Sequence, residues 1–151
     1  YLGRRYYIEV FVNNDLDRIN IDFTESKFKI SLPQILNQQE ELKQAFETFY
    51  RTKAKARINP RVRKWSKKTG LEYHELKFMK LEKRWGSSPP ANNILISIDA
   101  IKLPFSLIDY LIVHELVHTK IKNHSKEFWA ELAKYISNWK ELDGRMYGMK
   151  L

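Results

Sequence analysis

Three of the four histidines in this 151-residue chain lie in one short stretch, VHELVHTKIKNHSKEFW, at residues 113–129. His114, Glu115 and His118 form the pattern H-E-x-x-H. On an α-helix, residues four apart differ by about 40° around the axis, so both imidazoles project from one face and can bind the same ion. Neutral imidazole is a good ligand for Zn²⁺. Glu115 lies about 100° round from His114, which places it beside such an ion, where it can accept a proton from an activated water.

His124 is the obvious third ligand, because a catalytic zinc site needs three protein ligands and one open position. In a continuous helix, His124 would point about 240° away from His118. We therefore expect the helix to end between Thr119 and Asn123. Asn123 can adopt the left-handed conformation that ends helices, and Ser125 is a good N-cap for a following helix. The pattern predicts one Zn²⁺ per chain, held by His114, His118 and His124, with Glu115 as general base.

A histidine on a helix is more often an ordinary core or surface residue, and H-E-x-x-H also arises by chance. Two features favour a metal site. The third histidine lies at a workable spacing, and the flanking residues are apolar, so unpaired polar groups among them would be costly to bury. The apolar neighbours are Leu111, Ile112, Val113, Leu116 and Val117.

Other polar residues near the motif have two open interpretations. Asp109 could orient a ligand imidazole or form an ordinary salt bridge on the helix face. Arg84 could stabilise the oxyanion or anchor the substrate, or it could be a surface charge. Tyr135 and Tyr147 could stabilise the oxyanion, but nothing in the pattern selects either one. We expect the aromatic residues Trp85, Phe128 and Trp129 to lie in the core.

Composition narrows the class of protein. The chain has no cysteine, which excludes disulfides and thiolate metal sites. Its 43% hydrophobic and 13% aromatic content favours one folded globule. No apolar run approaches the ~18 residues of a membrane span, and no signal-peptide pattern is present, so we predict a cytoplasmic protein. Because the chain lacks an initiator Met, we expect it to be shortened at the N-terminus.

The net charge of +9 is concentrated in one segment. This segment could bind a polyanion such as nucleic acid, or it could be a solvated helix face. Its cations are Arg51, Lys53, Lys55, Arg57, Arg61, Arg63, Lys64, Lys67 and Lys68.

The periodicity predicts an α+β fold with one domain over residues 1–151. Alternating and β-branched residues predict an antiparallel β-meander within 1–33, with strands at 6–12, 18–24 and 27–32. Residues 34–151 are predicted to form the helical core that carries the histidines. It should contain helices at 40–57, 60–70, 104–121 and 125–135 and strands at 76–85 and 94–99, with a turn-rich link at 86–93. Pro60 suits the first turn of the second helix.

The segment around the motif resembles the YgjP-like metallopeptidase family, relatives of the SprT-like zinc proteases. That family typically reads R-W-G-S-C, then a strand, an I-D-Y-V-V-V-H-E-L-x-H helix and N-H-S-x-x-F-W. The matching segments here are 84–87, 108–110, 114–118, 123–125 and 128–129. Ser88 stands in place of the usual cysteine, and Pro89 and Pro90 follow where a flexible polar turn is common.

The resemblance implies a small zincin-like fold and a zinc metalloendopeptidase with His114, His118 and His124 as ligands and Glu115 as general base and acid. We expect an extended substrate to pair with an edge strand, for which residues 94–99 are the candidate. Two alternatives stay open. SprT-like relatives act on DNA-bound proteins, so the basic run at 51–68 could hold DNA. The zinc could also merely hold two helices together in a binding module without catalysis.

Overall fold

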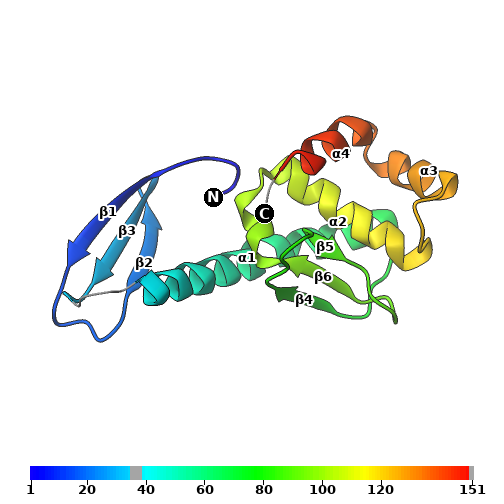
Figure 1. Ribbon diagram of the computed structural model, residues 1–151. Helices are drawn as coiled ribbons and strands as arrows, with labels where there is room; N and C mark the ends of the chain where they lie inside the picture. Colours follow the sequence, from blue (N-terminus) through cyan, green and yellow to red (C-terminus); the bar gives the residue numbers. More distant parts are fainter. Residues whose placement is uncertain (35–38, 150–151) are drawn as a thin grey trace.

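A computed structural model describes residues 1–34 and 39–149. The predicted domain covers residues 1–151, so residues 35–38 and 150–151 of that prediction lie outside the described residues. Figure 1 shows the first sheet at the N-terminal end of the long helix α1, with the second sheet and the other helices around the C-terminal half of α1. The elements are β1 (Tyr7–Val12), β2 (Asn20–Thr24), β3 (Lys27–Leu32), α1 (Gln39–Thr69), β4 (Leu76–Met79), β5 (Gly86–Ser87), β6 (Ile94–Ser97), the 3₁₀-helix η1 (Ile98–Lys102), α2 (Phe105–Lys120), α3 (Lys126–Tyr135) and α4 (Trp139–Tyr147). The predicted α+β class is confirmed.

Helix α1 runs without interruption through Pro60, so the prediction of two separate helices is wrong. A proline inside a helix removes one backbone hydrogen bond and costs about 3 kcal/mol. Packing offsets this cost, because Ala54, Ile58 and Val62 recur every fourth residue and are completely buried. The two predicted helices therefore share one apolar face and continue as one.

The first sheet has the order β1-β3-β2, which corrects the predicted antiparallel meander. Strands β2 and β3 form the expected antiparallel hairpin, with Glu25 and Ser26 at positive φ in its tight turn. Strand β1, however, lies parallel to β3 and not beside β2. Turn residues determine the pairing of strands that a short turn joins. Strand β1, whose side chains are mostly exposed, instead pairs with a strand that is not its neighbour in the sequence.

The second sheet has the order β4-β6-β5, with β4 parallel and β5 antiparallel to β6. Strand β6 is therefore central, and the prediction of residues 94–99 as a substrate-binding edge strand is wrong. Strand β4 is shorter than the predicted strand, and the predicted link at 86–93 contributes β5. At Ser97 the chain leaves β6 for η1, where the Ser97 hydroxyl accepts a hydrogen bond from the Asp99 backbone N–H.

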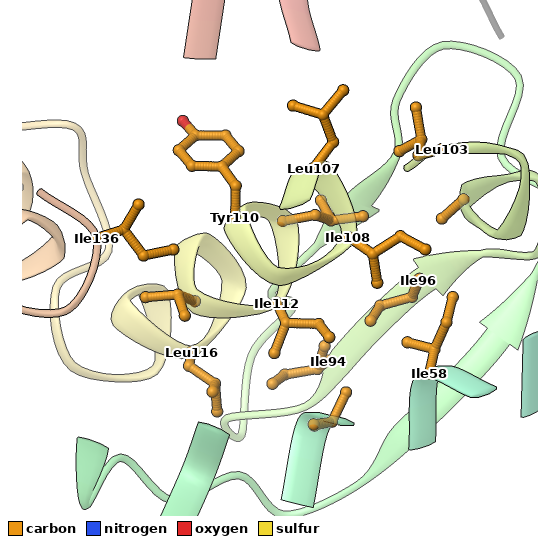
Figure 2. Close-up of a cluster of buried hydrophobic side chains, with 14 of the residues drawn as sticks. Ile58, Ile94, Ile96, Leu103, Leu107, Ile108, Tyr110, Ile112, Leu116 and Ile136 are labelled. Carbon is orange, nitrogen blue, oxygen red and sulfur yellow. The ribbon is translucent and has the colours of Figure 1, made fainter. Parts of the chain in front are cut away.

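The core lies between α1, β6, η1 and α2, and the apolar residues of α2 are mostly buried in it. Figure 2 shows Ile112 and Leu116 of α2 packing with Ile94 and Ile96 of β6 and Ile58 of α1. Among the described residues, no helix combines the length and the apolar character that a bilayer crossing requires.

Helix α2 ends at Lys120, inside the predicted interval, and Ser125 caps α3 as predicted by accepting a hydrogen bond from the Phe128 N–H. Helix α4 was not predicted. Its N-cap, Asn138, makes no side-chain capping bond and Gly144 lies inside the helix, so the local signal is weak. Packing of the buried Leu142 against the core stabilises α4 instead.

Candidate metal centre

The three histidines of the motif converge on one point. His114 and His118 project from α2, and His124 comes from the segment between α2 and α3. The distances between their Nε2 atoms are 3.2 Å for His114–His118, 3.1 Å for His118–His124 and 3.0 Å for His114–His124. Nitrogens bound tetrahedrally to zinc lie roughly 3.3 Å apart. The three lone pairs therefore enclose a space that fits a small divalent cation.

A sharp bend after α2 brings His124 to the other two rings. Ile121 adopts an extended conformation, with φ −124° and ψ 109°, and its N–H still donates to the Val117 carbonyl. Asn123 is not among the residues with positive φ, so the expected left-handed stop at that position is wrong. The helix ends because the chain extends at Ile121, where no glycine or proline is needed.

Hydrogen bonds to the opposite ring nitrogens orient two of the imidazoles. Nδ1 of His118 lies 3.0 Å from the Ile121 carbonyl oxygen, which can only accept, so Nδ1 donates. Nδ1 of His114 lies 3.4 Å from the Tyr110 hydroxyl, which itself donates to Oδ1 of Asp143 at 2.6 Å. Both contacts favour the tautomer in which Nε2 carries a free lone pair.

Burial keeps these imidazoles in the neutral form that binds metals. It lowers the pKa of His114 to about 3, with smaller contributions from the other two histidines. It also lowers the pKa of His118, although the hydrogen bond to Ile121 opposes this effect. Neutral rings at pH 7 are the state in which imidazole coordinates a cation.

Aromatic rings support the histidines from the side of α3. The completely buried Phe128 contacts all three imidazoles, with centroid distances of 4.9, 4.4 and 4.8 Å to His114, His118 and His124. Trp129 stacks on His124 at 5.5 Å and on Trp139 of α4 at 4.4 Å. The core role predicted for Phe128 is confirmed, and this packing leaves the histidine rings little freedom to turn.

Glu115 lies beside the histidines in an almost completely buried position, 4% exposed. Its Oε2 atom has no hydrogen-bond partner among the described residues. Burial raises the pKa of Glu115 to about 8, and the positive charge of Arg84 partly offsets the increase. A buried carboxyl without a partner is costly, and a cation held by the histidines would favour its charged form.

Gly86 of β5 makes room for this carboxyl. A Cβ atom at position 86 would lie 2.7 Å from Oε1 of Glu115 and 3.0 Å from Cδ1 of Leu111. Real Cβ atoms essentially never come as close as the first of these distances to another heavy atom, so a larger residue here would displace the carboxylate. The short strand β5 thus lies directly against the acidic group of the motif.

A cleft of about 540 Å³ opens onto the motif. Its wall includes His114, Glu115 and Arg84, together with the C-terminal part of α4 around Met146 and Tyr147. Tyr147 is 94% exposed, whereas the single proton of the Tyr135 hydroxyl is shared between Oε1 of Glu131 at 3.1 Å and the Thr69 carbonyl at 3.3 Å. Of the two candidate tyrosines, Tyr147 is the one that lines this cleft.

Asp109 makes a two-pronged ion pair with Arg61 of α1, at 2.8 and 2.6 Å, and no hydrogen bond to a histidine among the described residues. Asp109 therefore forms a salt bridge, as one of the two interpretations predicts. The bridge joins α1 to α2, whereas the prediction placed it within one helix face. Sequence reasoning missed Tyr110, Asp143 and Gly86. Tyr110 precedes His114 by one helical turn, which was a usable signal, whereas Asp143 and Gly86 reach the site only through tertiary packing.

Comparisons with known proteins relate the chain to metallopeptidases. The profile of the YgjP-like metallopeptidase domain matches residues 1–147. Among solved structures, the chain is similar to the metallopeptidase zymogen abylysin of Pyrococcus abyssi, with 21% identity, a TM-score of 0.53, and coverage of 58% of this chain and 90% of that one. It is also similar to the zymogen jannalysin of Methanocaldococcus jannaschii, with 22% identity, a TM-score of 0.53, and coverage of 60% and 93%. No curated protein matches the chain.

Proposed function

The chain belongs to the YgjP-like metallopeptidase family, and from this premise we propose that it is a zinc-dependent endopeptidase with Glu115 as its general base. A metallopeptidase hydrolyses peptide bonds, so its substrates are proteins or peptides. The proposal assigns His114, His118 and His124 as the ligands of one zinc ion per chain. The observation that carries it is the convergence of three Nε2 atoms within 3.2 Å of one another beside a buried carboxyl oxygen that has no hydrogen-bond partner within residues 1–34 and 39–149.

Zinc is the preferred metal because all three donors are neutral imidazoles, a set that suits Zn²⁺ better than Mg²⁺ or Ca²⁺. When bound, zinc would supply a Lewis acid that activates water and polarises the scissile carbonyl. Glu115 would accept the proton of the attacking water and pass it to the leaving amine. Burial of Glu115 limits the access of bulk water to its carboxyl. Gly86, which has no side chain, leaves room for this carboxyl beside the substrate.

We place the substrate in the cleft beside β5. Strand β5 lies at the edge of its sheet, next to Glu115, and an extended peptide could pair with an edge of this kind. Arg84, which lines the same cleft, would bind a substrate carbonyl or stabilise the oxyanion. Main-chain pairing of this kind requires little side-chain specificity, so we expect a broad substrate range.

The test is zinc content together with hydrolysis of a casein-like substrate. We expect one equivalent of zinc in the purified chain, weaker binding in His124→Ala, and unchanged binding in the matched control His74→Ala, whose exposed histidine lies outside the cluster. Glu115→Gln should keep the zinc and lower kcat by about 10²–10⁴-fold. Because the two similar structures are zymogens, the assay is repeated after limited proteolysis.

Two results would overturn the proposal. A chain that binds no zinc contradicts the ligand assignment. A wild-type chain that binds zinc and hydrolyses no member of a peptide library, before or after limited proteolysis, is instead a binding module in which zinc holds α2 and the α2–α3 segment together.

A second candidate is a peptidase that acts on proteins bound to DNA. Within the basic run, Arg51 and Arg61 are ion-paired with Glu47 and Asp109, but the other cations form no ion pair among the described residues. These cations without an acidic partner on α1 are available to bind a polyanion, but a solvated helix face would leave them equally unpaired, so DNA binding must decide between the two interpretations. If Lys64, Lys67 and Lys68 are replaced by alanine, the slope of log affinity for DNA against log salt concentration should become shallower by roughly 0.9 for each phosphate that is no longer neutralised. Salt-insensitive or absent DNA binding excludes this candidate.

We also propose that the chain acts as one domain, with the β1–β3 sheet as an extension of the helical core. The continuous helix α1 supports this, because one rigid element contacts the first sheet through β2 and the core through η1 and α2.

A further inference from the structure

We propose that Tyr110 and Asp143 are positioning residues that set the affinity of the metal centre through His114. This inference rests on the proposed function, because it concerns how one of the proposed ligands is held. The three residues form a chain from α4 through α2 to the centre, in which Asp143 accepts from Tyr110 and Tyr110 accepts from His114.

The direction of each hydrogen bond follows from the available protons. The Tyr110 hydroxyl has one proton, and the 2.6 Å distance to Oδ1 of Asp143 shows where it points, because a carboxylate only accepts. The hydroxyl can therefore offer only a lone pair to the imidazole, so Nδ1 of His114 is the donor. An Nδ1–H tautomer leaves the lone pair on Nε2, the atom that faces the other two histidines.

The surroundings of Tyr110 give this arrangement its rigidity. Tyr110 is 2% exposed, and in Figure 2 its hydroxyl points away from Ile94 and Ile112. The hydroxyl is hydrogen-bonded to Asp143 of α4. Burial, reinforced by Asp143, raises the pKa of Tyr110, so the hydroxyl stays protonated and continues to donate. The contact with His114, at 3.4 Å, is longer than a strong hydrogen bond, so we expect an effect at the lower end of the usual range.

His114 differs from the other two ligands in how it is held. A backbone carbonyl orients His118, and Nδ1 of His124 has no hydrogen-bond partner among the described residues. Within the described part of the chain, only His114 is therefore hydrogen-bonded to a side chain that itself hydrogen-bonds to a distant element. Because Asp143 belongs to α4, the docking of this helix becomes part of the metal site, and undocking it would weaken metal binding.

The test compares zinc dissociation constants, measured by competition with a chromogenic chelator, for the full wild-type chain and three variants. Partners of ligand histidines typically contribute 10–100-fold to metal affinity, so Tyr110→Phe should weaken zinc binding about 10-fold. Asp143→Asn, which keeps the shape but removes the charge, should weaken it severalfold. The matched control is Tyr135→Phe, which removes a comparable tyrosine–carboxylate bond, to Glu131, away from the histidines. It should stay within about twofold of wild type.

A nuclear magnetic resonance measurement separates positioning from general destabilisation. In the zinc-loaded wild type the Nδ1 proton of His114 should exchange slowly with water, and in Tyr110→Phe it should exchange faster, with no change in Tyr135→Phe. Unchanged affinity and exchange in Tyr110→Phe would overturn the inference, as would an equally weakened affinity in the control. If Tyr110→Phe does not fold, the affinity of Asp143→Asn decides. A wild-type chain without zinc affinity would instead contradict the proposed function.

Discussion

At the scale of single residues, the centre combines groups that would be unfavourable if they stood alone. Three imidazoles face one another with their lone pairs, and a carboxyl is buried beside them with one oxygen atom unpartnered among the described residues. Repulsion among the lone pairs and the cost of burying Glu115 are both relieved by a cation at the common point. The local chemistry therefore favours a metal site over a structural cluster of histidines.

Gly86→Ala tests how closely the carboxyl of Glu115, the proposed general base, is held. The new methyl group would lie 2.7 Å from Oε1 of Glu115, so the carboxyl must move. A misplacement of about 1 Å can cost up to ~100-fold in rate. We expect peptidase kcat to fall at least 10-fold while zinc content stays at one equivalent, because no histidine is touched.

Gly144→Ala is the matched control, since a Cβ there meets nothing within 4 Å. It should leave kcat unchanged and, being inside α4, stabilise the fold by up to about 1 kcal/mol. An unaltered kcat in Gly86→Ala would mean that Glu115 is not the proton acceptor or that it has room to move.

At the scale of elements, the turn between α2 and α3 decides whether the third histidine reaches the centre. Besides the Ile121 bend and the Ser125 cap, Glu131 of α3 links the two helices. Its Oε1 accepts from Lys120, the last residue of α2, at 3.3 Å, and its Oε2 accepts from Lys134 at 2.6 Å. Glu131 is 6% exposed, but the side chains of Lys120 and Lys134 are 56% and 60% exposed, so water partly screens both ion pairs.

Glu131→Gln should destabilise the protein in a pH-dependent way. The bond from Lys134, followed by those from Lys120 and Tyr135, lowers the pKa of Glu131 below its ordinary value of 4.5. A lowered pKa means that the stabilisation is complete above the ordinary value and disappears as the pH falls through the folded-state value. In urea denaturation at neutral pH we expect the free energy of unfolding to fall by about 1–3 kcal/mol.

The difference between Glu131→Gln and wild type should shrink as the pH falls below the ordinary carboxyl value. Glu141→Gln serves as the control, because its partner Arg145 lies 3.7 Å away at an exposed site. Its effect should stay below about 1 kcal/mol. A destabilisation by Glu131→Gln that is the same at neutral and acidic pH would show that the charge is not what stabilises the helix pair.

At the scale of the whole molecule, the metal centre joins parts that are far apart in the sequence. The histidines belong to α2 and the segment after it, Gly86 to the second sheet, and Trp139 and Asp143 to α4. The first sheet lies away from this region, at the other end of α1 (Figure 1). A ligand bound at the centre should therefore stabilise the helical core as a whole.

Removal of the metal should therefore lower the thermal stability of the protein. A ligand that binds only the folded state stabilises it by about 2.7 kcal/mol at 100 times its Kd, and in a chain of this size each kcal/mol shifts Tm by roughly 2–4 °C. We expect a chelator to lower Tm by roughly 5–10 °C and added zinc to restore it. In His124→Ala the shift should be much smaller, and a wild-type Tm that ignores the chelator would argue against a tightly held ion.

The local features of the centre could be predicted from the sequence. The face shared by His114 and His118, the end of the helix before Asn123 and the cap at Ser125 all follow from helix geometry and from residues close to one another in the chain. The α+β class follows from periodicity in the same way. These features depend on interactions within one or two helical turns, so the order of residues is enough to specify them.

Tertiary structure alone decided the features that depend on residues distant in the chain. The passage of α1 through Pro60, the parallel pairing of β1 with β3 and the central place of β6 each depend on partners distant in the chain. In α1, burial of the apolar face outweighed the local signal of Pro60. The Asp143–Tyr110–His114 chain and the space left by Gly86 arise in the same way. The sequence by itself determined which groups could bind a metal ion, and packing decided which groups surround them.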